Sequence, residues 1–184
     1  MSRVVLCVGH QSSAKGAVAV NGVTEWDFNE SIVDMIKKNM SGIKSIEVVC
    51  IKPDVKFSKK ARNINHENPT LALEFHFNAA EDPRAEGVEV LHYAGSKNGR
   101  KLAELLCNTI AGAFSSKNRG SKPIAKRSDR GGSVLIDTIC PCVILEPFFG
   151  SNHKETELFM SDEGKQKYAS AVAKALAAYF GVVA

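Results

Sequence analysis

Short apolar segments alternate with amphipathic helical patterns along the whole chain. Strand-like segments lie at 3–8, 44–51, 70–77, 87–93 and 142–146, and apolar residues recur at helical spacing in 24–40, 96–114 and 162–180. Strands that alternate with helices predict an α/β fold, in which helices cover the faces of a sheet. With 184 residues, of which 44% are hydrophobic, the chain is long enough for one sizeable core and short for two. We therefore expect a single domain over residues 1–184.

The segment 70–78 has an apolar and a polar side in regular alternation. One parity carries Leu71, Leu73, Phe75 and Phe77, and the other carries Glu74, His76 and Asn78. The apolar parity can pack on helices, which leaves the polar one near the carboxyl end of the strand, where open α/β sheets place their sites. A histidine on a half-buried sheet is usually a hydrogen-bonded structural residue, so this segment alone assigns no function to His76.

Three further residues stand where a strand or a helix meets a loop. His10 follows the first strand and a glycine. Thr24 is predicted to cap a helix that begins with Glu25, a position where the helix dipole favours a carboxylate. Glu146 ends the apolar run "CPCVILE", where a carboxylate is costly unless it is paired, hydrogen-bonded or facing a cleft.

Together these residues make a coherent hydrolase set. Two histidines and a carboxylate are ligand types of a catalytic zinc site, which keeps its fourth position for water. A second carboxylate can act as general base and later as proton donor. His10, Glu25, His76 and Glu146 supply these groups. Residue types alone do not separate the two histidines from the other three in the chain, because no HExxH helix is present.

Short motifs follow one another along the chain in a characteristic order. They are "VGHQSSAKGA" (8–17), "NGVTE" (21–25), "EFHFNAA" (74–80), "GVEVLHY" (87–93), "GRKLAELL" (99–106), Arg119 with Gly120, "GGSVLID" (131–137) and "PCVILEPFFGSN" (141–152). In order and context they resemble the zinc-dependent N-acetylmuramoyl-L-alanine amidases of the amidase 3 group. The resemblance runs over almost the whole chain.

This resemblance implies a fold, an activity and a set of site residues. The fold would be a twisted mixed sheet with helices on both faces. One Zn²⁺ per chain would be bound by His10, Glu25 and His76, and Glu146 would be the catalytic carboxylate. The substrate would be peptidoglycan. A water molecule deprotonated with the help of Glu146 would attack the lactyl carbonyl, and this would separate N-acetylmuramic acid from the L-alanine of the stem peptide.

One position departs from the family pattern. The residue two before the second histidine is small and polar in many relatives, whereas here it is Glu74. We expect Glu74 to pair with a base such as Arg62, to orient an imidazole as a hydrogen-bond acceptor, or to face solvent. Asn78 and Arg130 are further candidates for supporting the ligands or binding the substrate.

The most basic stretch of the chain covers residues 117–130. Its basic residues are Lys117, Arg119, Lys122, Lys126, Arg127 and Arg130. It has no aromatic residue that could stack on bases, so we interpret it as a solvated loop flanking the site and expect no nucleic-acid binding. Some relatives insert an inhibitory helix in this region. Little here looks helical, and we expect an openly accessible site.

The cellular context is predicted from what accompanies the motifs. A net charge of +4, from 24 basic and 20 acidic residues, suits an anionic cell wall. We expect no signal peptide, no stable membrane insertion and no separate wall-binding domain. These features resemble the endolysins of phages that attack Gram-negative hosts. Such proteins are made in the host cytoplasm and act on peptidoglycan in the periplasm or cell wall. We expect a monomer.

Other functions stay open at this point. A cellular autolysin without a leader would have the same activity, and a zinc peptidase would use the same ligands. A non-catalytic wall-binding module is disfavoured, because all three expected ligands and Glu146 are present. A nucleotide-binding α/β protein is disfavoured too, because the loop after the first strand has no glycine-rich phosphate cradle.

Overall fold

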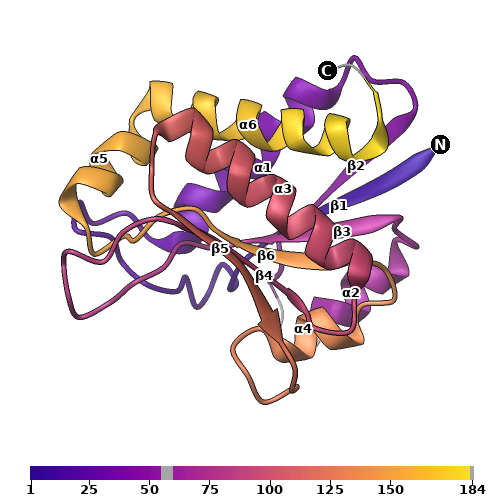
Figure 1. Cartoon of the computed structure of the whole chain (residues 1–184), viewed down its shortest axis with the longest axis horizontal. Coiled ribbons are helices and arrows are strands. Elements are labelled where there is room, and N and C mark those ends of the chain that lie inside the picture. Colours follow the sequence, from indigo (N-terminus) through magenta and orange to yellow (C-terminus); the bar gives the residue numbers. More distant parts are fainter. Residues whose placement is uncertain (55–59, 183–184) are drawn as a thin grey trace.

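The predicted alternation of strands and helices is present in the structure (Figure 1). The computed structural model describes residues 1–54 and 60–182, and within these ranges the chain forms one six-stranded sheet with helices packed on it. In chain order the elements are β1 (Ser2–Val8), α1 (Glu25–Met40), β2 (Ile46–Ile51), α2 (Lys60–His66), β3 (Leu71–Phe75), β4 (Val88–Tyr93), α3 (Lys97–Phe114), β5 (Asn118–Ile124), α4 (Gly132–Asp137), β6 (Cys142–Glu146), α5 (His153–Met160) and α6 (Asp162–Phe180).

The direction of the strands decides which side chains can meet. The strand order is β2-β1-β3-β6-β4-β5, and neighbouring strands of this sheet are parallel except for β4 and β6. The sheet is mixed, with helices on both faces, so the predicted fold class is confirmed. Because β1, β3 and β6 run in the same direction, their carboxyl ends lie at one edge. The antiparallel β4 begins at that edge.

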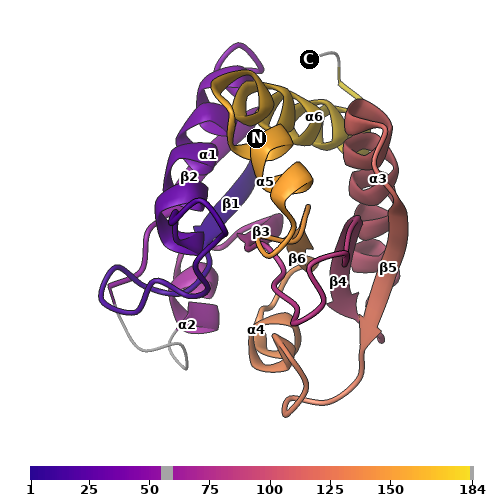
Figure 2. The ribbon, with the colours of Figure 1, turned by 90° about the vertical axis from the view of Figure 1, so that its left-hand side faces the viewer.

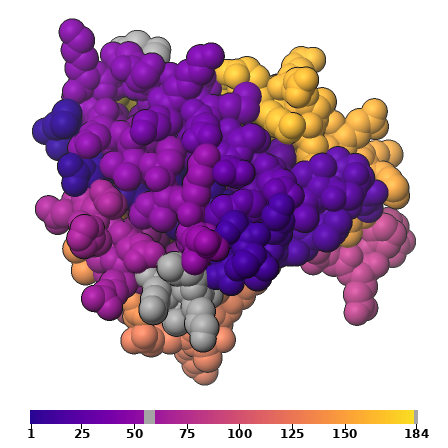
Figure 3. All heavy atoms as spheres, turned by 180° about the vertical axis from the view of Figure 1, so that it is seen from behind, coloured from indigo at the N-terminus to yellow at the C-terminus, as the bar shows by residue number. Residues whose placement is uncertain are grey.

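Two apolar clusters fill the layers on either side of the sheet. On one face, α1, α3 and α6 cover the strand residues on the parity of Leu73 and Phe75 (Figures 1 and 2). On the other face, a smaller cluster joins Ala72 to Ile64 of α2 and Leu135 of α4. The apolar parity predicted for 70–78 is therefore the one that packs on the larger helical layer. Seen from behind, the N-terminal part of the chain, coloured indigo to purple, covers much of the molecule (Figure 3).

The interpretation of residues 117–130 as a loop is wrong for its first half. Residues 118–124 form β5, which pairs in parallel with β4 at the end of the sheet. An edge strand has only one pairing partner and one covered face, so it tolerates the polar residues, Gly120 and Pro123 that hide it in the sequence. The short helices α2, α4 and α5 were not predicted either. No helix in the described ranges has the length and apolarity needed to cross a bilayer.

Helix α1 begins where the sequence predicts. The Thr24 side chain accepts a hydrogen bond from the backbone N–H of Asp27 at 3.2 Å, and its hydroxyl donates to the Asp27 carboxylate at 2.7 Å. This reciprocal pair satisfies a backbone donor that the first turn of a helix otherwise leaves unpaired. The predicted cap is confirmed, and it fixes the start of the helix immediately before Glu25.

We expect Thr24→Ala to lower the free energy of unfolding by about 1 kcal/mol, because it removes the hydroxyl that caps α1. Urea denaturation followed by circular dichroism measures the change. Thr24→Ser is the matched control, since it keeps the hydroxyl and should recover most of the loss. Equal losses in the two variants would show that the threonine methyl group, and not the cap, is responsible.

Candidate metal centre and active site

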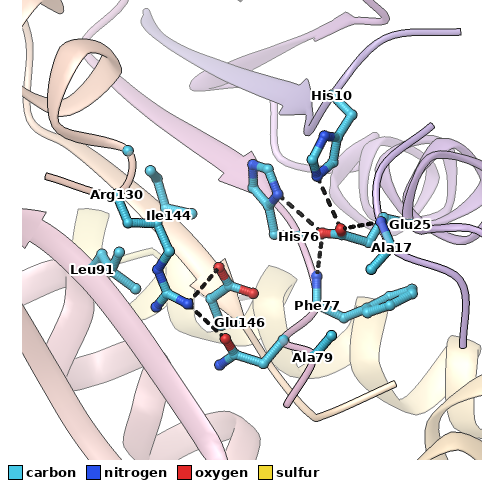
Figure 4. A pocket seen from close by; sticks show the side chains of 12 residues that line it. His10, Ala17, Glu25, His76, Phe77, Ala79, Leu91, Arg130, Ile144 and Glu146 are labelled. Atoms are coloured by element: carbon cyan, nitrogen blue, oxygen red, sulfur yellow. Dashed lines mark hydrogen bonds and ion pairs between the residues drawn. The ribbon is translucent and has the colours of Figure 1, made fainter. Parts of the chain in front are cut away.

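Three predicted ligand residues converge at the edge where β1 and β3 end and α1 begins (Figure 4). His10 lies two residues after β1, Glu25 is the first residue of α1, and His76 directly follows β3. One potential ligand atom from each of the three lies within 4.8 Å of the others. His10 adopts a left-handed backbone conformation with φ 60°, which is uncommon for a residue other than glycine. The convergence is built by three separate segments.

The Glu25 carboxylate connects the two imidazoles. Its Oε2 lies 2.9 Å from His10 Nε2, and its Oε1 lies 3.1 Å from His76 Nδ1. Backbone N–H groups also donate to it, from Ala17 to Oε2 at 2.9 Å and from Phe77 to Oε1 at 3.1 Å. Each oxygen therefore has one imidazole and one backbone partner, so the carboxylate is held in a single orientation.

Two glycines leave the room that these side chains occupy. A Cβ on Gly9 would lie 2.6 Å from His76 Cε1. A Cβ on Gly16, whose φ is 79°, would lie 2.4 Å from His10 Cδ2 and 2.7 Å from Glu25 Oε2. Such contacts are shorter than van der Waals packing permits, so a larger residue at either position would displace a side chain of the cluster. This explains Gly9, which precedes His10, and Gly16, the penultimate residue of the "VGHQSSAKGA" motif.

The charges of the cluster reinforce one another. Burial alone would raise the pKa of Glu25, but hydrogen bonds with His10 and His76 hold it well below its usual range. Burial alone would lower the pKa of His76, but the neighbouring carboxylates of Glu74 and Glu25 raise it to about 10. Glu25 is thus an anion throughout the physiological range, as a metal ligand must be.

Glu146 lies at the end of β6 in the same pocket, which has a volume of about 310 Å³ and is also lined by the three cluster residues. Its side chain is almost fully buried, and within the described part of the chain its Oε2 has no hydrogen-bond partner. Burial raises the pKa of Glu146 to about 7, although the positive charges of His76 and Arg130 oppose the shift. A carboxyl group with such a pKa can both accept and donate a proton near neutral pH.

Arg130 reaches the pocket from the loop before α4, where Figure 4 shows it beside Glu146. Its Nη1 donates to Asn78 Oδ1 at 2.7 Å, and its Nη2 donates to Glu89 Oε1 at 2.8 Å. Arg119 also donates to Glu89, at 2.8 Å. The guanidinium is thereby placed 3.9 Å from Glu146 Oε1, with about half of the Arg130 side chain exposed to solvent. Of the segment 117–130, which was predicted to flank the site, Arg130 is the residue that lines the pocket.

Glu74 lies behind His76, on the face of the sheet that carries α2. Its Oε1 lies 3.1 Å from His76 Nε2, and the same oxygen pairs with the ammonium group of Lys60. Lys60, rather than Arg62, is therefore the base beside Glu74. Arg62 is exposed, because it lies two residues further along α2 and points away from the sheet that Lys60 faces.

Two residues of this arrangement were missed by the sequence analysis. Glu89, near the start of β4, holds Arg119 and Arg130. The motif "GVEVLHY" contained the signal for it, since a carboxylate inside an apolar strand needs partners. Lys60 had no such signal, because a lysine at a helix start is normally solvated.

The side chains present fit a bound transition metal. Two imidazoles and one anionic carboxylate form the donor set, and they lie on the wall of a pocket large enough for a further ligand. Backbone N–H groups donate to Glu25, and Glu74 contacts His76, so both donors have the kind of additional partner that is common around protein-bound metals.

Several solved structures share the fold. An N-acetylmuramoyl-L-alanine amidase from Clostridium difficile 630 superposes with a TM-score of 0.88 at 19% identity, covering 98% of this chain and 97% of its own. The catalytic domain of the amidase CwlV from Bacillus (Paenibacillus) polymyxa var. colistinus gives 0.87 at 19% identity, with 100% of both chains covered. The catalytic domain of CD27L, an endolysin that targets Clostridia difficile, gives 0.76 at 21% identity, covering 96% of this chain and 97% of its own.

Sequence comparison supplies the family. No curated protein matches the chain in sequence. The Amidase_3 family model, described as N-acetylmuramoyl-L-alanine amidase, matches residues 4–178. This range contains the whole His10, Glu25 and His76 cluster together with Glu146, and it covers nearly all of the described fold. The chain belongs to the N-acetylmuramoyl-L-alanine amidase family and is a hydrolase that acts on peptidoglycan.

Proposed function

We propose that the chain cleaves the amide bond between N-acetylmuramic acid and L-alanine with one zinc ion held by His10, Glu25 and His76, and with Glu146 as the general base. The observation that carries this proposal is the approach of the three donors to within 4.8 Å of one another in the pocket that also contains Glu146. These donor types match a catalytic zinc site, which has three protein ligands and one open position.

A zinc ion in this position would supply Lewis acidity, which polarises a carbonyl group and favours the ionisation of water. The protein must then provide a proton acceptor. Glu146 suits this role because one of its oxygens has no partner within the described residues, and because its pKa of about 7 lies close to physiological pH. After accepting the proton, the same group can return it to the nitrogen of the departing L-alanine.

Arg130 and Asn78 support the reaction from the other side of the pocket. Asn78 and Glu89 hold the Arg130 guanidinium beside Glu146, which keeps a positive charge near that carboxyl group. Arg130 lines the pocket with about half of its side chain exposed, so it can bind a carboxylate of the stem peptide. We assign Arg130 to substrate binding and Asn78 to the positioning of Arg130.

We also propose that the chain acts as a monomer in the lysis of a host cell by a phage. The fold is shared with the catalytic domain of the CD27L endolysin. The net charge of +4 favours contact with an anionic wall. Synthesis in the host cytoplasm, followed by access to peptidoglycan once the inner membrane is permeabilised, is the sequence of events that this role requires.

Digestion of purified peptidoglycan tests the chemistry. We expect the zinc-loaded protein to release intact stem peptides with new L-alanine amino termini, identified by mass spectrometry. Chelation should abolish release, because it removes the Lewis acid. Glu146→Gln should lower the turnover rate about 10²- to 10⁴-fold, because it removes the proton acceptor while preserving the size of the side chain.

Metal content and substrate binding are the controls for this digestion. Glu146→Gln should still bind one zinc ion per chain and sediment with the wall, so its loss of activity is chemical. Shortened glycan chains or opened peptide cross-links would assign a different hydrolytic activity. Zinc-independent release of stem peptides would exclude the proposed mechanism.

The buried Glu146 carboxyl group predicts a pH dependence of stability in the metal-free protein. Its pKa is 4.5 in a solvated chain and about 7 in the folded protein. Between these values the folded state keeps a proton that the unfolded state has lost, so this group lowers stability as pH rises and has no further effect above about pH 7. Above about pH 7 the raised pKa of Glu146 lowers the free energy of unfolding by about 3 kcal/mol, compared with a group that keeps its ordinary pKa.

Glu146→Gln removes this titration. We expect the free energy of unfolding of the variant, relative to the parent protein, to increase by about 3 kcal/mol between about pH 4.5 and about pH 8, measured by urea denaturation with chelator present. A difference that does not change with pH would show that Glu146 has an ordinary pKa in the folded state.

Lysis from within tests the biological role. The protein is produced in the cytoplasm of a Gram-negative host, and the inner membrane is then permeabilised. We expect the culture to lose turbidity within minutes of permeabilisation, while cells producing Glu146→Gln stay intact. Lysis before permeabilisation, or none after it from an enzyme active on purified wall, would reject the host-lysis role and leave the amidase assignment standing.

A further inference from the structure

A buried ion pair, Lys60 with Glu74, lies next to the proposed metal ligand His76. Lys60 and Glu74 are both fully buried, with side-chain exposures of 0%. Glu74 is in β3, and Lys60 is the first residue of α2 on the face of the sheet opposite to the larger helical layer. Burying two charges is expensive, and an apolar pair of similar size would often be as stable. The pair therefore calls for an explanation beyond stability.

The contact that explains it is with the imidazole of His76. Glu74 Oε1 lies 3.1 Å from His76 Nε2, whereas His76 Nδ1 lies 3.1 Å from Glu25 Oε1. The two nitrogens of one ring thus face two different carboxylates. Nδ1 faces Glu25 in the cluster that fits a metal (Figure 4), and Nε2 faces Glu74 of the ion pair.

We propose that Glu74, neutralised by Lys60, is a positioning residue that accepts a hydrogen bond from His76 Nε2–H and so directs the lone pair of Nδ1 to the metal. This inference rests on the proposed metal site. A neutral imidazole carries one proton, and fixing that proton on one nitrogen makes the other the ligand atom.

Lys60 supports this role of Glu74. Its ammonium group pairs with the Glu74 carboxylate where both side chains are fully buried, which offsets much of the cost of burying that anion beside His76. Within the described residues Glu74 Oε2 has no hydrogen-bond partner, so Oε1 carries the contacts to both Lys60 and His76.

A purely structural alternative is that the pair only attaches α2 to the sheet. The two explanations differ in what happens to metal affinity in a folded variant. In a Lys60→Met background, Glu74→Gln and Glu74→Leu both give a neutral pair of similar volume. Glutamine keeps an oxygen that can accept from Nε2–H, and leucine does not. The comparison separates the hydrogen bond from the charge.

Zinc affinity of the folded proteins is measured by competition with a chromophoric chelator. We expect the Lys60→Met/Glu74→Leu variant to bind zinc about 10- to 100-fold more weakly than the parent protein, and Lys60→Met/Glu74→Gln to recover a large part of the loss. In the zinc-loaded parent protein with ¹⁵N-labelled histidine, NMR should show a protected Nε2–H on His76. That signal should be lost in the leucine variant.

Glu155→Gln is the matched control, because it also converts a buried carboxylate to an amide. Glu155 accepts from the backbone N–H groups of Gly87 and Phe149 and lines no part of the metal pocket. It should lose stability without losing zinc affinity. Parental zinc affinity in the folded leucine variant, or Nε2 as the coordinating atom, would overturn the positioning role. Failure of the parent protein itself to bind zinc would instead reject the proposed function.

Discussion

The arrangement of the site depends on the Glu25 carboxylate. Its two oxygens each take one imidazole and one backbone N–H, which ties the ends of β1 and β3 to the start of α1. The Thr24 cap fixes the residue before it, and Gly16 leaves space beside it. Because one buried anion satisfies partners from three segments, none of them can shift alone. The cluster is therefore organised by the fold, as expected for a site built to hold a metal.

Much of this could be predicted from the sequence, for identifiable reasons. The apolar residues of β3, β6 and α1 recur at the spacing expected for strands and for a helix. The α/β fold class could therefore be predicted from this pattern. The choice of His10 and His76 among five histidines came from motif order, since spacing alone does not encode proximity. β5 was not predicted, because a strand at the edge of a sheet needs few apolar residues. The burial of Lys60 was not predicted, because it depends on a contact with Glu74 in the next element of the chain, β3.

The pKa of one carboxyl group in the pocket, Glu25, is lowered, whereas the pKa of another, Glu146, is raised. Their surroundings explain the difference. Glu25 has hydrogen-bond donors at both oxygens, which keep it ionised despite its burial. Glu146 has one oxygen without a partner in the described part of the chain, and Arg130 approaches the other only to 3.9 Å, so burial prevails. The protein thus separates a group that must remain an anion from one that must exchange a proton, using donor count and not residue type.

The antiparallel direction of β4 also shapes the rim of the pocket. Residues 76–87 leave the sheet edge with His76 and return to it just before Glu89, which pairs with Glu146 across the strands. Both ends of this loop are anchored, by the bridge of Asn78 to Phe149 and by the bond from Gly87 to Glu155, while residues 81–84 are exposed. Ala79 lines the pocket and lies between the anchors, so insertions after it would add residues beside the pocket without moving His76. Substrate range could therefore diversify in evolution at this loop while the chemistry stays constant.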